Sequence, residues 1–134
     1  MYPYNLPLGE LKQSMRTNIL VVDDDPDILE ALKMMLEDQG YSVETAQNGN
    51  ILQFLDETNL PSVIILDVLL SGIDGREIAE KLRQKKETHE IPIVMISANP
   101  EAAKDCVKRG ANAFLAKPFE IDDLLSVIHK YAPQ

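Results

Sequence analysis

The 134-residue chain has one cysteine and no tryptophan, and aromatic residues make up only 5% of it. A single cysteine excludes an internal disulfide and is typical of a reducing compartment, so we expect a cytoplasmic protein. We interpret Cys106 as a small helix residue rather than a nucleophile, because neither His89 nor His129 has an evident reason to lie near it.

Basic residues are also scarce, with 13 Lys and Arg against 22 Asp and Glu, which gives a formal net charge of −9. Nucleic-acid phosphates need a basic binding face, so we expect no direct nucleic-acid partner. The surplus acid serves solubility and suits a divalent cation or a positively charged protein partner. No apolar run approaches the about 20 residues of a membrane span, and the N-terminus lacks the features of a signal peptide, so we expect no membrane association.

Short apolar runs alternate along the chain with stretches of helical periodicity. Strands are predicted at 18–22, 41–46, 63–67, 93–97 and 113–116, and helices at 26–39, 48–55, 76–86, 101–109 and 121–128. The run 63–67 is typical of a strand buried on both faces of a parallel sheet. The alternation predicts one α/β domain over residues 18–134, with a doubly wound parallel sheet and five helices. Residues 1–17 are expected to be a flexible N-terminal extension, and Met15 is an alternative start.

Polar side chains follow or end four of the five predicted strands. Asp23 and Asp24 follow the first, Asp67 ends the third, Ser97 ends the fourth and Lys117 follows the fifth. In a sheet of order 2-1-3-4-5 these four strands are neighbours, so their carboxyl ends meet at one crevice. Each residue alone could be an ordinary strand end or helix cap. Their occurrence together favours a site.

Six short segments occur in a fixed order along the chain: ILVVDD at 19–24, ILD at 65–67, GIDG at 72–75, SA at 97–98, GA at 110–111 and KPF at 117–119. In this order they resemble the receiver domain of two-component response regulators, which has a flavodoxin-like fold. The resemblance covers about residues 18–131.

The resemblance implies that Asp67 accepts a phosphoryl group from a histidine kinase or a histidine phosphotransfer protein. It implies Mg²⁺ as cofactor, with Mn²⁺ as a substitute, bound directly by Asp24, Asp67 and the backbone carbonyl of Leu69, and by Asp23 through water. Lys117 and Ser97 would donate to phosphoryl oxygens. The chemistry is coherent, because clustered carboxylates repel one another and Mg²⁺ prefers oxygen ligands. Such a chain is a regulatory phosphoacceptor rather than an enzyme.

The resemblance also implies a switch in which phosphorylation draws Ser97 inward and Phe114 rotates into the vacated space. Phe114 could equally be an ordinary core residue. The fourth helix, fifth strand and fifth helix would then signal to an unknown output protein or domain, or form a homodimer. The family has a cis Lys117–Pro118 bond, which proline permits.

Three features depart from the family pattern. Ser71 stands where a proline is usual, so we expect a more mobile loop. Leu69 is apolar where many receivers have a polar residue that positions water, so we expect a long-lived phosphoryl state. The stretch from Ser97 to Gly110 is about two residues short, so we expect a fourth helix that starts late or is short.

Alternatives from other classes fit less well. A haloacid-dehalogenase-type phosphatase needs an aspartate two positions after its nucleophile, where this chain has Leu69. An EF-hand beginning at Asp23 fails, because Ile28 stands where glycine is needed and Met34 where glutamate is needed. A degenerate receiver that acts only as a docking module remains open. We favour a single-domain regulator over a piece of a longer protein, which also remains open.

Overall fold

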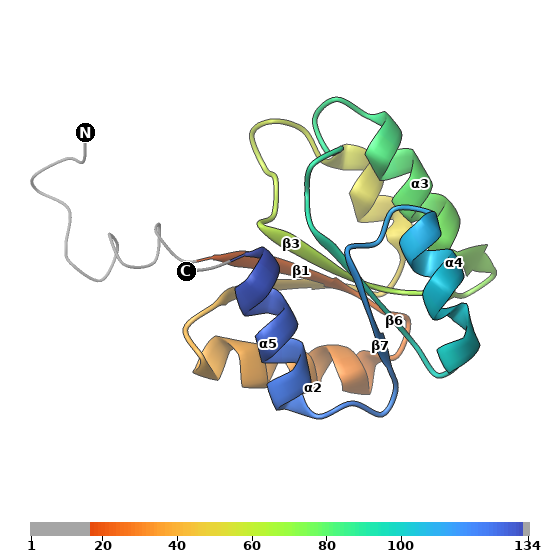
Figure 1. The fold of residues 1–134 in the computed structure, drawn as a ribbon. Helices are drawn as coiled ribbons and strands as arrows, with labels where there is room; N and C mark the ends of the chain where they lie inside the picture. Colours follow the sequence, from red (N-terminus) through yellow and green to blue (C-terminus); the bar gives the residue numbers. More distant parts are fainter. Residues whose placement is uncertain (1–16, 133–134) are drawn as a thin grey trace, which may run out of the picture.

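The computed structural model describes residues 17–132, and its centre is a five-stranded parallel sheet (Figure 1). The predicted extension, except for Thr17, lies outside the described residues. The strand order is β2-β1-β3-β6-β7, which confirms the predicted doubly wound arrangement. The strands are β1 (Asn18–Val22), β2 (Ser42–Ala46), β3 (Val63–Asp67), β6 (Ile93–Ser97) and β7 (Ala113–Ala116).

Helices cover both faces of this sheet (Figure 1). The first face carries α2 (Pro26–Asp38) and α5 (Ile121–Tyr131), and the second carries the 3₁₀ helix η1 (Gly49–Phe54), α3 (Gly75–Gln84) and α4 (Ala103–Lys108). Because side chains alternate along a strand, β3 supplies two separate cores. Ile65 packs with the α2–α5 cluster, whereas Leu66 packs with the α3–α4 cluster. Burial on both faces explains the continuous apolar run of β3.

The start of α2 shows why the chain turns directly after β1. The Asp25 carboxylate caps the helix by accepting a hydrogen bond from the backbone N–H of Asp27 at 2.9 Å. Pro26 occupies the first turn, where its missing N–H removes no helical bond. Gly40 adopts φ 96° just beyond the helix, as expected of a glycine that ends it.

The second predicted helix is present, and it is a short 3₁₀ helix over residues 49–54 rather than an α-helix. Gly49 and Asn50 are poor helix formers, and the segment is too short to offset the cost of starting an α-helix. Beyond η1, the carboxylate of Asp56 accepts hydrogen bonds from the backbone and hydroxyl of Thr58, which fixes a turn instead of another helical turn.

The fourth helix is short, as predicted. The single turn η2 (Pro100–Ala102) precedes the six-residue α4. Two ion pairs connect α4 and its C-cap to α3: Arg76 to Asp105 at 3.1 Å and Arg109 to Glu80 at 2.6 Å. These contacts help to hold a helix that is too short to be stable alone.

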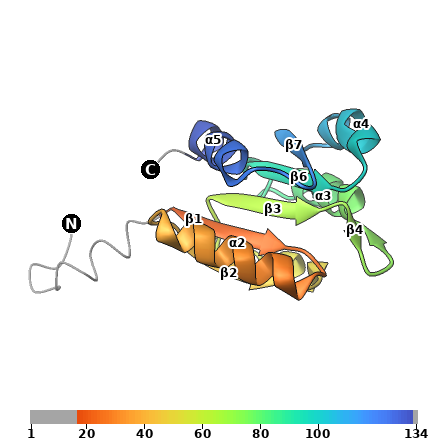
Figure 2. The same ribbon diagram turned by 90° about the horizontal axis from the view of Figure 1, so that it is seen from below.

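A hairpin that the sequence analysis did not predict lies beyond β3. Its strands are β4 (Leu69–Leu70) and β5 (Ile73–Asp74), which pair antiparallel. Figure 2 shows β4 projecting past the carboxyl end of β3. The hairpin therefore borders the edge of the sheet at which the predicted site residues lie.

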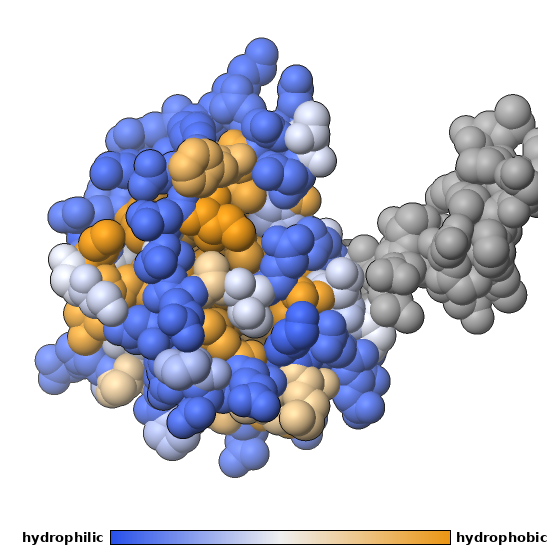
Figure 3. Space-filling model, turned by 180° about the vertical axis from the view of Figure 1, so that it is seen from behind, coloured by the Kyte–Doolittle hydropathy of each residue, from blue (hydrophilic) through white to orange (hydrophobic). Residues whose placement is uncertain are grey.

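The face seen from behind carries hydrophilic side chains with apolar patches between them (Figure 3). Within the described part of the chain, the most exposed large apolar side chains are Phe54 at 72% and Leu69 at 69%. Among residues 17–132, no helix combines the length and the hydropathy that crossing a bilayer requires.

Candidate functional site

Three aspartates meet at the carboxyl ends of β1 and β3. Asp23 and Asp24 follow β1 directly, and Asp67 is the last residue of β3. Each offers a carboxylate oxygen, and these oxygens lie within 4.8 Å of one another. Asp23 is fully buried, Asp67 is 6% exposed and Asp24 faces solvent. The predicted convergence of these three carboxylates is thus observed.

Lys117 supplies the positive charge of the cluster. Its Nζ lies 2.8 Å from Asp23 Oδ2, to which it donates a hydrogen bond, and 3.5 Å from Asp67 Oδ1. The backbone aligns this side chain, because the Lys117 N–H donates to the carbonyl of Ser97 at 2.8 Å. The Lys117–Pro118 peptide bond is cis, as the resemblance implied.

The surroundings of Asp67 disfavour the charged form of its carboxyl group. Burial, followed by the charge of Asp23, raises the pKa of the Asp67 carboxyl to about 6, although Lys117 opposes the shift. Burial by itself lowers the pKa of Lys117, but its hydrogen bond to Asp23 and the two carboxylate charges outweigh burial and raise it. Asp67 is therefore an anion that is costly to form without further positive charge, whereas Lys117 stays protonated.

Asp24 is held from the hairpin side by Ser71. Both the N–H and the hydroxyl of Ser71 donate to Asp24 Oδ2, at 3.2 and 3.1 Å. Ser71 has φ 36°, a left-handed value that a proline ring cannot adopt. The sequence analysis considered Ser71 only as a missing proline and did not find this contact. The predicted mobility of the loop stays a prediction.

Gly75 allows the start of α3 to pack directly behind Asp67. A Cβ at this position would clash with the carbonyl oxygen of Asp67. The Gly75 N–H also donates to the carbonyl of Val68, at 2.6 Å. The sequence analysis quoted Gly75 as part of a motif but gave it no role. It fixes the distance between the hairpin and the end of β3.

Ser97 and Phe114 lie on the strands that the sequence predicted for them, but only Ser97 lies at the end of the sheet that carries the carboxylate cluster. Ser97 ends β6, is 3% exposed, and its Oγ accepts a hydrogen bond from the Asn99 N–H at 3.0 Å. Phe114 lies in β7, where it pairs with Met95 of β6, two residues before Ser97. Its side chain is half-buried against the α3–α4 core. Phe114 is thus outside the carboxylate cluster.

The cluster has the chemistry of a divalent-cation site. When ionised, Asp23, Asp24 and Asp67 carry three negative charges, of which Lys117 balances one. The donors are all oxygen atoms, which suits Mg²⁺ better than a softer metal. Leu69, whose carbonyl was predicted to bind the metal, lies two residues beyond Asp67 at the start of β4, with its side chain exposed.

Comparison with known proteins identifies the family. Residues 19–129 match the family model described as "Response regulator receiver domain". The chain is 39% identical over 120 residues to the nitrogen assimilation regulatory protein NtrX of Azorhizobium caulinodans, covering 87% of this chain but 26% of NtrX. Other curated relatives are the MprA response regulators of Mycobacterium, of which the chain spans about half (49%).

Solved structures agree with this match. A proposed response regulator from Chloroflexus aurantiacus is 35% identical with a TM-score of 0.82, and the match covers 89% of this chain and 99% of that one. The receiver domain of the sensor histidine kinase PA1611 from Pseudomonas aeruginosa is 26% identical with a TM-score of 0.79, at the same coverage, and holds magnesium in its active-site cleft. The chain therefore belongs to the response regulator receiver domains of two-component signalling.

Proposed function

We propose that Asp67 is a phosphoacceptor, that its phosphoryl donor is a phosphohistidine of a kinase or phosphotransfer protein, and that Mg²⁺ is required. The observation that carries this proposal is the convergence of Asp23, Asp24 and Asp67 with the Lys117 ammonium at the end of β3. A receiver that acted only as a docking module would not need these four charged groups in contact.

Asp67 acts as the nucleophile in this reaction. One carboxylate oxygen forms a bond to phosphorus while the bond from phosphorus to the donor nitrogen breaks, and the leaving imidazole keeps the electron pair and takes up a proton. Lys117, which lies 3.5 Å from Asp67 Oδ1, donates to a phosphoryl oxygen. The Ser97 hydroxyl would donate to another.

Asp24, Asp67 and the Leu69 carbonyl would hold the metal, with Asp23 contributing through water. A bound Mg²⁺ supplies positive charge that offsets both the carboxylates and the phosphoryl oxygens. Ser71 keeps the Asp24 carboxylate at the rim of the site through two hydrogen bonds. Hydrogen bonds of this kind orient metal-binding carboxylates and support their affinity.

The switch follows from the position of Ser97. Its hydroxyl would turn toward the phosphoryl group, and Phe114 would repack within the α3–α4 core, which changes the surface formed by α4, β7 and α5. That surface would then contact an output protein or a second copy of the chain. Leu69 offers no polar atom from its side chain to position water, so the phosphoryl group would be lost slowly.

Intact-mass spectrometry tests the central step. Incubation with acetyl phosphate and Mg²⁺ is expected to add one phosphoryl group, and neither the Asp67→Asn protein nor wild type in EDTA should gain it. Asp25→Asn is the matched control, because Asp25 is an exposed carboxylate that only caps α2. No adduct on wild type with acetyl phosphate or phosphoramidate, together with no Mg²⁺ binding by calorimetry, would favour the docking module.

A further inference from the structure

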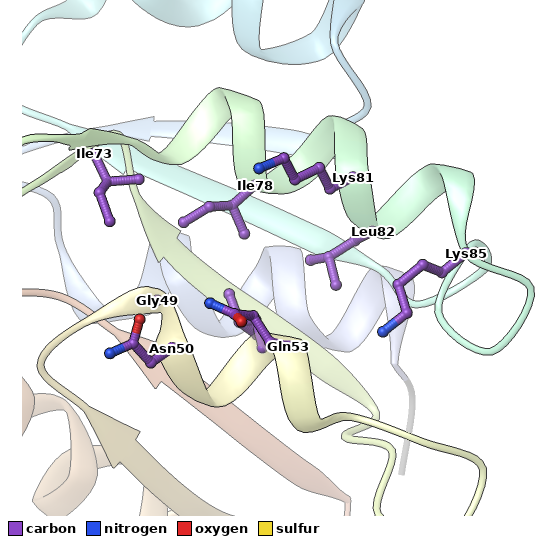
Figure 4. Close-up of a pocket in the computed structure, with 9 residues that line it drawn as sticks. Gly49, Asn50, Gln53, Ile73, Ile78, Lys81, Leu82 and Lys85 are labelled. Carbon is purple, nitrogen blue, oxygen red and sulfur yellow. The ribbon is translucent and has the colours of Figure 1, made fainter.

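A separate pocket of about 420 Å³ lies between η1 and α3 (Figure 4), and none of the clustered aspartates lines it. Leu52 and Leu82, both nearly fully buried, form its apolar wall together with Ile78. Ile73 of β5 adds a fourth apolar side chain. The volume lies within the range of about 300–1,000 Å³ that is common for small-molecule sites.

Polar side chains from both helices border this apolar wall. Lys81 lies in the last turns of α3, and Lys85 is the C-cap residue just beyond the helix. Asn50 and Gln53 are three residues apart in η1, and residues at this spacing align in a 3₁₀ helix. Figure 4 shows Gln53 and Lys85 reaching toward the space between the two helices, whereas Lys81 lies along α3. The pocket is thus lined by two amide side chains from η1 and by two lysines from the other side.

The charge of the pocket differs from that of the chain. Acidic residues outnumber basic ones by 22 to 13 overall, yet the pocket is lined by two lysines and no carboxylate. Within residues 17–132, neither Lys81 nor Lys85 forms an ion pair. The charge of Lys85 also acts on the exposed Asp56 carboxylate, whose pKa is lowered first by hydrogen bonds from Thr58 and then by this charge. Two ammonium groups beside an apolar wall complement a ligand that has an apolar body and a negative end.

We propose that this pocket binds a small amphipathic carboxylate, with an aromatic or short aliphatic body. The body would cover Leu52, Ile78 and Leu82, and the carboxylate would accept hydrogen bonds from the lysines at the rim. Charge-assisted hydrogen bonds of this kind are stronger than neutral ones. The ligand would also contact Ile73, which belongs to the same hairpin as Leu69 and Ser71, so this hairpin links the pocket to the aspartate cluster although the two share no residue.

Nuclear magnetic resonance can test this with 2-naphthoate as the probe and 2-naphthamide as its uncharged counterpart. We expect saturable amide shifts within residues 49–53 and 78–85 on titration of the full chain with 2-naphthoate, and at least fivefold weaker binding of the amide. The Lys81→Gln and Lys85→Gln variants should each weaken 2-naphthoate binding about threefold to tenfold. Lys86→Gln is the control, because Lys86 is exposed and does not line the pocket.

Three results would overturn the proposal: equal affinity for the acid and the amide, an equal loss of affinity in Lys86→Gln, or shifts centred on Asp67 and Lys117. The absence of any saturable shift would overturn it as well. None of these readouts depends on phosphorylation, so this proposal and the phosphoacceptor proposal can fail separately.

Discussion

Replacing Asp67 by asparagine should stabilise the metal-free protein at neutral pH. The native carboxyl has its pKa raised to about 6 from 3.8, first by burial and then by the charge of Asp23. The shift of about 2 pKa units corresponds to about 3 kcal/mol, since each unit is worth about 1.4 kcal/mol. Asparagine has nearly the same shape and no charge, so it avoids this cost.

The pH dependence gives the prediction its sign. The native carboxyl holds its proton more tightly than the unfolded one, so this group lowers stability as pH rises from about 4 to about 6, with no further change above. The free energy of unfolding of Asp67→Asn minus that of wild type should therefore be small near pH 4 and reach about 2–3 kcal/mol by pH 7.

Urea unfolding followed by far-ultraviolet circular dichroism, in EDTA, measures this difference, and Asp25→Asn should change stability by less than about 0.5 kcal/mol. Saturating Mg²⁺ should then reduce the advantage of Asp67→Asn, because it binds the wild-type native state more tightly. A difference that is constant across this pH range, or one that grows toward low pH, would refute the electrostatic account of Asp67.

Three further substitutions probe the surroundings of the site. Ser71→Ala should weaken Mg²⁺ binding about fivefold in calorimetry, because Asp24 loses a positioning hydrogen bond of about 1 kcal/mol; unchanged affinity would show that Ser71 does not orient Asp24. Leu69→Asn should shorten the lifetime of the phosphorylated protein about tenfold or more. The decay is measured by intact-mass spectrometry after the phosphoryl donor is removed. An equal or longer lifetime would exclude the proposed effect of the apolar side chain. Gly75→Ala should lower the free energy of unfolding by at least about 2 kcal/mol, because its Cβ clashes with the Asp67 carbonyl oxygen. Wild-type stability would mean that α3 shifts freely at its start.

The sequence predicted most of what positions the site, for a physical reason. Strands buried on both faces must be apolar throughout, so the run ending at Asp67 indicated both a strand and its central place. Polar residues at the carboxyl ends of neighbouring parallel strands lie at the same edge of the sheet, so the strand order by itself brings them together. The positions of Asp23, Ser97 and Lys117 followed from this argument and needed no knowledge of side-chain contacts.

Other features depend on tertiary geometry that one sequence does not carry. Ser71 and Asp24 are 47 positions apart, and their contact needs the left-handed backbone at Ser71. The two-residue strands of the hairpin are too short to show a period. The spacing of Ile51, Leu52 and Leu55 fits an α-helix as well as the observed 3₁₀ helix, so a helix was predicted there but neither its 3₁₀ geometry nor the pocket beside it.

Mapping the phosphorylated residue tests the central claim most directly. Borohydride reduces an aspartyl phosphate to homoserine, so wild-type protein treated with acetyl phosphate and Mg²⁺ can be reduced, digested and sequenced by mass spectrometry. We predict homoserine at position 67 and at no other aspartate. Homoserine at Asp23 or Asp24, or no conversion in protein whose intact mass shows a phosphoryl group, would contradict the assignment of Asp67 as the phosphoacceptor.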